Sequence, residues 1–118
     1  MDNKKIVEIT TLDGVTIVSF NEISMGAAAE IETLSRQMTH LIEGDKPMKM
    51  VVDFEKVKFF SSQTLGLLLD VRKKLQAYNG QVVISGINPQ LHRVFKITNL
   101  DKIFTFYPDV ESAVNGIS

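Results

Sequence analysis

Hydrophobic residues follow two different periods along this chain. Segments 6–10 and 15–20 are rich in β-branched residues and partly alternate between apolar and polar positions. Asp13-Gly14 separates them, and Asp-Gly is typical of the two-residue turn that joins antiparallel strands. The N-terminal region therefore predicts a β-hairpin.

Other segments repeat their apolar residues every three or four positions, which is the period of an amphipathic helix. In the first such segment the apolar stripe consists of Ile31, Leu34, Met38 and Leu41. Asn88 followed by Pro89 is a typical helix start, because asparagine caps a helix and proline fits its first turn. We expect helices over about residues 26–43, 62–78 and 89–97, and a short one after Pro108-Asp109.

Three more strands are expected over residues 48–54, 81–85 and 103–106, each separated from the next by a helix. Strands joined through helices pair in parallel, whereas the opening hairpin pairs antiparallel. The sequence thus predicts an α/β fold with a mixed five-stranded sheet, which opens with an antiparallel hairpin and is flanked by about four helices. At 118 residues, we expect a single domain over residues 1–118.

Composition narrows the classes of function. Thirteen basic residues against fourteen acidic ones leave a net charge of −1, so binding to nucleic acid lacks its main driving force. The chain has no cysteine, which excludes disulfides, a thiolate nucleophile and a cysteine-rich metal site. No apolar segment reaches the roughly twenty residues that span a bilayer. We expect a soluble, cytoplasmic protein without a membrane span.

The residues needed for catalysis are not grouped in the sequence. His40 and His92 are the candidate bases near neutral pH, but neither accompanies a nucleophile motif or the spacing of metal ligands. Asp53 ends a strand, as the acceptor of a phosphoaspartate receiver does, but the expected partner carboxylates and lysine are missing. We expect Asp53 to accept hydrogen bonds from the backbone of the following loop. No enzymatic activity, metal or cofactor is predicted.

Hydroxyl residues gather where the second long helix begins. Ser61, Ser62 and Thr64 surround Gln63 at the end of an apolar segment. A helix start has unpaired N–H groups and a positive dipole end, so it accommodates both hydroxyl caps and phosphate. Phosphorylation there would add nearly two negative charges to a neutral surface. A purely structural cap is the alternative interpretation.

Gly66 lies inside the same predicted helix, where glycine costs roughly 1 kcal/mol relative to alanine. We interpret it as a point of close packing of the helix on the sheet. The alternative is that the missing side chain lets a partner approach the turn at residues 61–64.

Three blocks together resemble the STAS domain, the family of bacterial anti-sigma factor antagonists. The first block is Met50–Leu69, which resembles the strand, loop and helix that carry the family's Asp-Ser-Ser-Gly motif. The second is Asn79–Ile84, and the third is Val94–Phe104. The resemblance covers nearly the whole chain, and it implies the same order of strands and helices as the hydrophobic pattern.

In phosphorylatable family members the acceptor is the second serine of Asp-Ser-Ser-Gly. Alignment on the flanking residues places Gln63 at that position, and glutamine cannot be phosphorylated. Either a neighbour such as Ser62 or Thr64 has taken over, or the chain is not switched in this way. The family's acidic loop near its partner surface corresponds to residues 21–24, where the acidic residue at the fourth position is lost.

The resemblance implies a regulatory domain that binds an anti-sigma factor, or a related serine/threonine kinase-type protein, and so releases a sigma factor. A phosphorylation-independent STAS scaffold in a signalling complex is the alternative, and a homodimer is compatible with either. Binding of a nucleotide or lipid is a third class, for which the sequence predicts no pocket. The candidate phosphoacceptors are Ser62, Thr64 and Ser61. The candidate partner-binding residues are Asn21, Glu22, Ser24, Ser61, Ser62, Gln63, Thr64 and Gly66.

Overall fold

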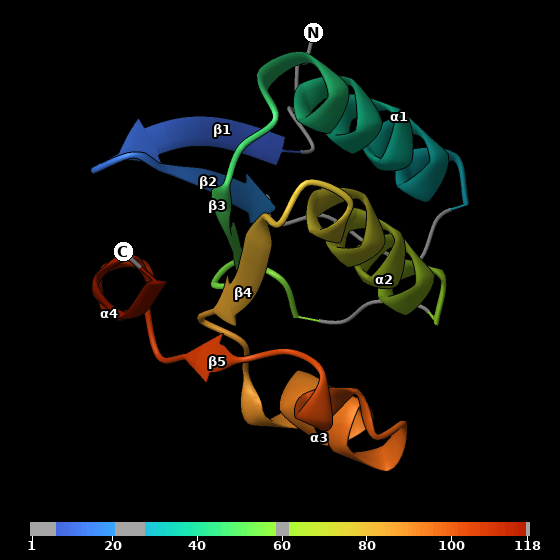
Figure 1. Ribbon diagram of the computed structural model, residues 1–118. Coiled ribbons are helices and arrows are strands. Elements are labelled where there is room, and N and C mark those ends of the chain that lie inside the picture. Colours follow the sequence, from blue (N-terminus) through green and yellow to red (C-terminus); the bar gives the residue numbers. More distant parts are fainter. Residues whose placement is uncertain (1–6, 21–27, 59–61, 118) are drawn as a thin grey trace, which may run out of the picture.

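Five strands form one sheet in the order β1-β2-β3-β4-β5 (Figure 1). The computed structural model describes residues 7–20, 28–58 and 62–117. The strands are β1 (Val7–Leu12), β2 (Val15–Phe20), β3 (Lys49–Asp53), β4 (Gln81–Ser85) and β5 (Phe106–Tyr107). The helices are α1 (Ala28–Asp45), α2 (Ser62–Gln76), α3 (Pro89–Ile97) and α4 (Val110–Ile117), with a 3₁₀ turn at Leu100–Lys102.

The sheet is mixed, as the sequence predicts. β1 pairs antiparallel with β2, and β3, β4 and β5 continue the sheet in parallel. The hairpin turn has positive φ at both Asp13 (52°) and Gly14 (79°), which is the conformation of a type I′ turn. This turn fixes the β1–β2 register, in which Leu12 lies opposite Val15 and Ile9 opposite Val18.

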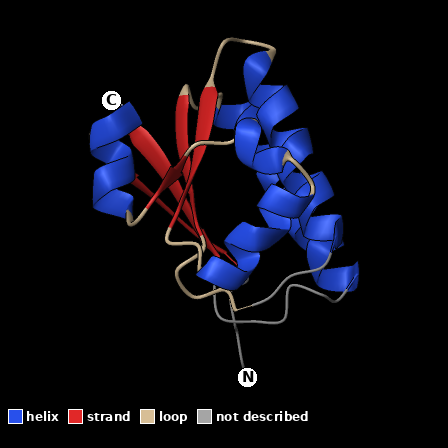
Figure 2. Cartoon of the chain, turned by 90° about the horizontal axis from the view of Figure 1, so that it is seen from below, coloured by secondary structure: helices blue, strands red, loops and turns tan. Residues whose placement is uncertain are grey.

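Helices cover both faces of the sheet (Figure 2). Figure 2 shows α4 on one side of the strands and the other helices on the opposite side. Two clusters of buried side chains correspond to these two faces. The larger contains side chains of α1, α2 and α3 and includes Val18, Phe20, Val52 and Ile84 from the strands. The smaller joins Val15, Ile17, Val51 and Val83 to α4.

The buried face of α2 is broader than the sequence pattern suggested. The spacing of residues in the helix predicted over residues 62–78 places Leu65, Leu68, Leu69, Arg72 and Leu75 along one side. Leu65, Leu68 and Leu75 are buried as expected, and so are Leu67 and Val71. Leu69, which the pattern placed on the buried side, is 37% exposed. Because α2 packs both on β4 and against α1, it buries more than one stripe of residues.

The last strand starts later than its hydrophobic residues predict. The sequence placed it at residues 103–106, but β5 spans Phe106–Tyr107. Asn99 adopts a left-handed conformation (φ 63°) after α3, and the 3₁₀ turn follows it. Phe104 is buried, as expected of an apolar residue, but it lies before β5 and not in a strand. Its ring contacts the ring of Phe95 of α3 edge-on, at 6.0 Å between ring centroids.

Candidate interaction site

The first turn of α2 forms an exposed polar end of the molecule. Ser62 is the first residue of this helix, and Ser62 and Gln63 are both exposed. The first turn of the helix has no acidic residue, so no carboxylate there offsets the positive end of its dipole. This end can therefore receive an anionic group or a hydrogen-bond acceptor from outside.

Thr64 does not belong to that exposed surface. It is 0% exposed, because it lies on the side of α2 that packs inward together with Leu65. The expectation that Thr64 is an accessible phosphoacceptor or partner contact is therefore wrong. Its spacing from Ser62, two residues along a helix, turns it to a different face of the helix.

Gly66 lies on the outer side of α2, one turn after Ser62. Apart from its two chain neighbours and the nearby backbone of its own helix, a Cβ atom built on Gly66 would meet no atom within 4 Å. The interpretation of Gly66 as a close contact with the sheet is thus wrong, and the open space favours the alternative of partner access. Gly66 leaves a gap in the side-chain cover between exposed Ser62 and Leu69, which lie on the same side of the helix.

A small groove, which sequence reasoning missed, adjoins this end of α2. It has a volume of about 350 Å³ and lies between Gln63 and the α1 residues Ile31, Glu32, Ser35 and Arg36. Arg36 and Glu32 form an exposed ion pair at 3.6 Å on α1. Gln63 thus borders a shallow depression whose opposite wall carries one positive and one negative side chain. Only the packing of α1 beside α2, which no single segment encodes, creates it.

The site hereafter called the α2 tip comprises Ser62, Gln63, Gly66 and Leu69. Four other predicted site residues, Asn21, Glu22, Ser24 and Ser61, lie outside the described residues. The structure thus brings Ser62, Gln63 and Gly66 together on one exposed end and excludes Thr64.

A buried carboxyl group supports the loop that leads toward α2. Asp53, at the end of β3, is 7% exposed, and its Oδ1 accepts a hydrogen bond of 2.9 Å from Ser85 Oγ. Burial raises the pKa of Asp53, while hydrogen bonds from Ser85 and from the backbone N–H of Glu55 oppose that rise. The expectation that Asp53 accepts backbone hydrogen bonds from the following loop is confirmed by the Glu55 contact.

The two histidines lie apart from the α2 tip. His40 is exposed on α1, and His92 of α3 packs on the ring of Phe106 at 4.5 Å between centroids. Among the residues described, His, Cys, Asp and Glu form no group of three that could hold a metal ion. In the described ranges, no helix combines the length and apolar character that crossing a membrane requires.

Residues 7–113 match the family model of the STAS domain. The chain belongs to the STAS domain family. The resemblance seen in the sequence is thereby confirmed, and the family match takes in every strand and both the α2 tip and the Asp53–Ser85 pair.

Individual STAS proteins are similar over most of the chain. An anti-sigma F factor antagonist from Paenibacillus polymyxa is 26% identical over 81 residues, which are 69% of each chain. The crystal structure of an anti-sigma factor antagonist from Mycobacterium paratuberculosis is 27% identical, covers 94% of this chain and 92% of its own, and has a TM-score of 0.81. A STAS domain protein from Planctomyces limnophilus shares the fold at 23% identity, with coverage of 93% and 96% and a TM-score of 0.84.

Proposed function

We propose that this STAS protein is an anti-sigma factor antagonist, which binds an anti-sigma factor through the α2 tip and thereby releases a sigma factor. Its relatives from Paenibacillus polymyxa and Mycobacterium paratuberculosis bear that description. The observation that carries the site assignment is the open position at Gly66 beside exposed Ser62 and Gln63. The proposal requires binding alone, in the cytoplasm, with no reaction catalysed by this chain.

The α2 tip offers a partner a rigid and uncharged contact surface. Gly66 lets a partner side chain approach the helix backbone, and exposed Leu69 adds apolar contact area. Ser62 and Gln63 supply hydrogen-bonding groups at the rim. Such a surface favours a partner that inserts an apolar side chain next to a polar hydrogen-bonding group.

Ser62 is the phosphoacceptor in this proposal. It is exposed and stands at the helix start, where a phosphate would meet free backbone N–H groups and the positive dipole end. The modified protein would stay folded, while its contact surface would change from neutral to strongly negative. Phosphorylation would then end binding to a partner that fits the neutral tip.

The test is a binding titration against kinase-type anti-sigma factors encoded in the same genome. Ser62→Asp adds a charge at the tip, and Gly66→Arg fills the gap; each should weaken binding at least about tenfold. The matched control is Asn115→Arg, an exposed residue of α4 on the other face of the sheet, which should bind as the native protein does. Equal affinity for all three variants would remove the α2 tip as the binding site.

A phosphorylation-independent scaffold is the second candidate, and Gln63 is the observation that favours it. Glutamine stands at the position of the family's usual acceptor, and it is exposed. Mass spectrometry of the protein isolated from its native cells separates the two candidates. Phosphate on Ser62 supports the switch, whereas an unmodified tip under all growth conditions supports the scaffold.

A further inference from the structure

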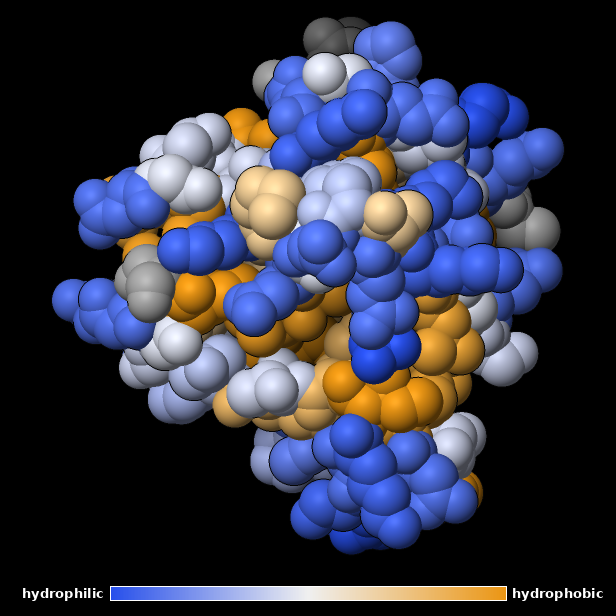
Figure 3. Space-filling model, viewed as in Figure 1, coloured by the Kyte–Doolittle hydropathy of each residue, from blue (hydrophilic) through white to orange (hydrophobic). Residues whose placement is uncertain are grey.

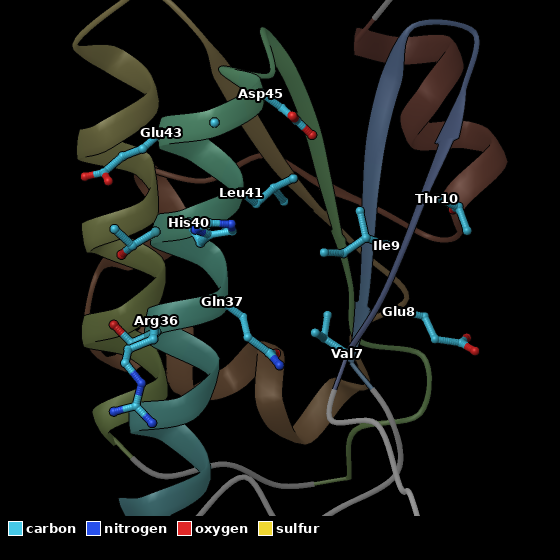
Figure 4. Close-up of a pocket in the computed structure, with 13 residues that line it drawn as sticks. Val7, Glu8, Ile9, Thr10, Arg36, Gln37, His40, Leu41, Glu43 and Asp45 are labelled. Carbon is cyan, nitrogen blue, oxygen red and sulfur yellow. The ribbon is translucent and has the colours of Figure 1, made fainter.

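An open groove of about 1090 Å³ runs between β1 and α1 (Figure 4). Figure 4 shows Val7 and Ile9 pointing from the strand toward the helix, and Leu41 pointing from the helix toward the strand. Glu8 and Thr10 point to the other side of the strand. Ile9 is 44% exposed, although it lies on the face that carries the larger core. An apolar side chain therefore stands half covered in this groove.

The backbone of β1 is also only half paired. β1 is the first strand of the sheet, and in the described part of the chain its strand neighbour is β2. In a two-residue hairpin the residues that flank the turn, here Leu12 and Val15, exchange hydrogen bonds, and such pairs alternate along the strands. By this alternation Val7, Ile9 and Thr11 direct their N–H and C=O groups to the open edge.

The edge lacks the usual protection against pairing. Natural edge strands are commonly blocked by lysine, proline, a bulge or an inward-pointing charge. The sequence of β1 is Val-Glu-Ile-Thr-Thr-Leu, and its one charged residue, Glu8, points away from the groove. The β1 residues that point into the groove, Val7 and Ile9, are β-branched and favour strands strongly. On the face of the molecule drawn in Figure 3, polar side chains cover most of the surface, and apolar side chains gather toward its middle.

We propose that β1 pairs antiparallel with β1 of a second copy, which joins two five-stranded sheets into one. An antiparallel pair related by a two-fold axis places each residue opposite a residue of the same face. The register that gives the open-edge groups of all three residues a partner places Ile9 opposite Ile9 of the partner subunit, and Val7 opposite the partner subunit's Thr11. All outward-facing groups of Val7, Ile9 and Thr11 obtain partners, and the two isoleucines cover one another.

The charges along α1 fit a second copy in this orientation. Figure 4 shows that α1 and β1 run the same way, with Arg36 near the level of Val7, and Glu43 and Asp45 beyond the level of Ile9. All three side chains line the groove. The two-fold axis reverses α1 of the partner, so Arg36 of each copy comes to the end of the groove where the partner's Glu43 and the partner's Asp45 lie. Arg36 also pairs with Glu32 of its own helix. Antiparallel self-association is therefore favoured by charge as well as by backbone pairing.

Sedimentation velocity over a series of protein concentrations measures this association directly. The native chain should form a dimer. Ile9→Lys should raise the dimer dissociation constant at least about tenfold, because two like charges would then lie directly opposite. The matched control is Leu12→Lys, on the same strand but on its other face, where Leu12 is 46% exposed. A native chain that stays monomeric, or an Ile9→Lys variant that dimerises like the Leu12→Lys variant, would overturn the proposal.

A second variant tests the register without adding a charge. The chain has no cysteine, so a single introduced cysteine can cross-link only to its counterpart. Hydrogen-bonded antiparallel residues have Cα atoms about 5.5 Å apart, which a disulfide can span. Ile9→Cys should give a disulfide-linked dimer on mild oxidation. Leu12→Cys should not, because the two Leu12 positions would lie roughly 20 Å apart in this register. Equal cross-linking of both variants, or none, would contradict this pairing.

This inference is independent of the proposed function, because Ile9 lies on β1 and not at the α2 tip. Loss of dimerisation in Ile9→Lys with intact binding of an anti-sigma factor would leave the function standing. Conversely, a dimer that binds no anti-sigma factor would overturn only the function.

Discussion

Ser85 donates a hydrogen bond of 2.9 Å to Asp53, the residue directly opposite it in the β3–β4 register. The pair joins the ends of two central strands, and the backbone N–H of Phe54 bonds the carbonyl oxygen of Ser85 at 2.9 Å beside it. Two strand ends are thus held together at the point where β3 passes into the loop before α2. The carboxyl group in this pair is buried, and this gives the stability of the protein a particular pH dependence.

The pKa of Asp53 is raised by burial, so the folded protein binds its proton more tightly than the unfolded chain does. As pH rises from the unfolded pKa to the higher folded pKa, the contribution of Asp53 to the free energy of unfolding must fall. Asp53→Asn removes this titration. The stability of the native protein relative to Asp53→Asn should therefore decrease as pH rises through this window. Urea unfolding at a series of pH values measures it, and a difference that is flat or rises with pH would contradict the burial argument.

Gly86, directly after β4, should tolerate no side chain. Its φ is +67°, and a Cβ atom there would lie 2.8 Å from Asp53 Oδ1. Gly86→Ala should lower the free energy of unfolding by more than about 1 kcal/mol, since the left-handed conformation alone costs that much. Chemical denaturation checks this, and an unchanged stability would contradict both the strain at this φ and the close contact with Asp53.

Gly66→Ala is the opposite case. Position 66 is helical and has open space, so alanine should stabilise the fold by about 0.5–1 kcal/mol. The same denaturation experiment measures the gain. A loss of stability would show that Gly66 is needed for packing after all. A gain in stability combined with weaker partner binding would mark the glycine as a residue kept for contact.

Asn88 should be important for the stability of α3. Its side-chain oxygen accepts a hydrogen bond of 2.9 Å from the N–H of Leu91, and its amide nitrogen donates to the carbonyl oxygen of Val57 at 3.3 Å. Asn88→Ala should cost about 1 kcal/mol from the cap alone. Asn88→Asp keeps the acceptor but loses the donor, so the difference between Asn88→Asp and the native protein measures the Val57 contact, and the difference between the two variants measures the cap. Equal stability of all three proteins would show that neither bond matters.

The fold was predictable from the sequence because local signals and global pattern agree. The Asp13-Gly14 turn, the Asn88-Pro89 helix start and the alternation of strands with helices each fixed one part of the order. The errors occurred where tertiary packing overrides a local pattern. Ile103 and Phe104 resemble a strand, yet a 3₁₀ turn places Phe104 against Phe95.

The site was only partly predictable for the same reason. The sequence identified Ser62, Gln63 and Gly66, but the direction of each side chain depends on which faces of α2 are covered. Thr64 faces inward because α2 buries more than one stripe, and Gly66 faces outward. The groove beside Ile9 could not be predicted from the sequence. An apolar residue in an alternating pattern is expected to be buried whether its strand is central or at the edge of the sheet. The edge position of the opening hairpin was predictable from its antiparallel pairing, and the order of strands in the sheet confirms it.

Ser35 and Arg36 of α1 line both the small groove beside Gln63 and the large groove beside β1. One helix is thus a wall shared by two cavities, and anything that shifts it on one side changes the shape of the other. If dimerisation changes the affinity of the protein for a regulator, thermodynamic linkage requires that the regulator change the dimerisation constant by the same factor. Protein concentration itself would then act as an input to the signal.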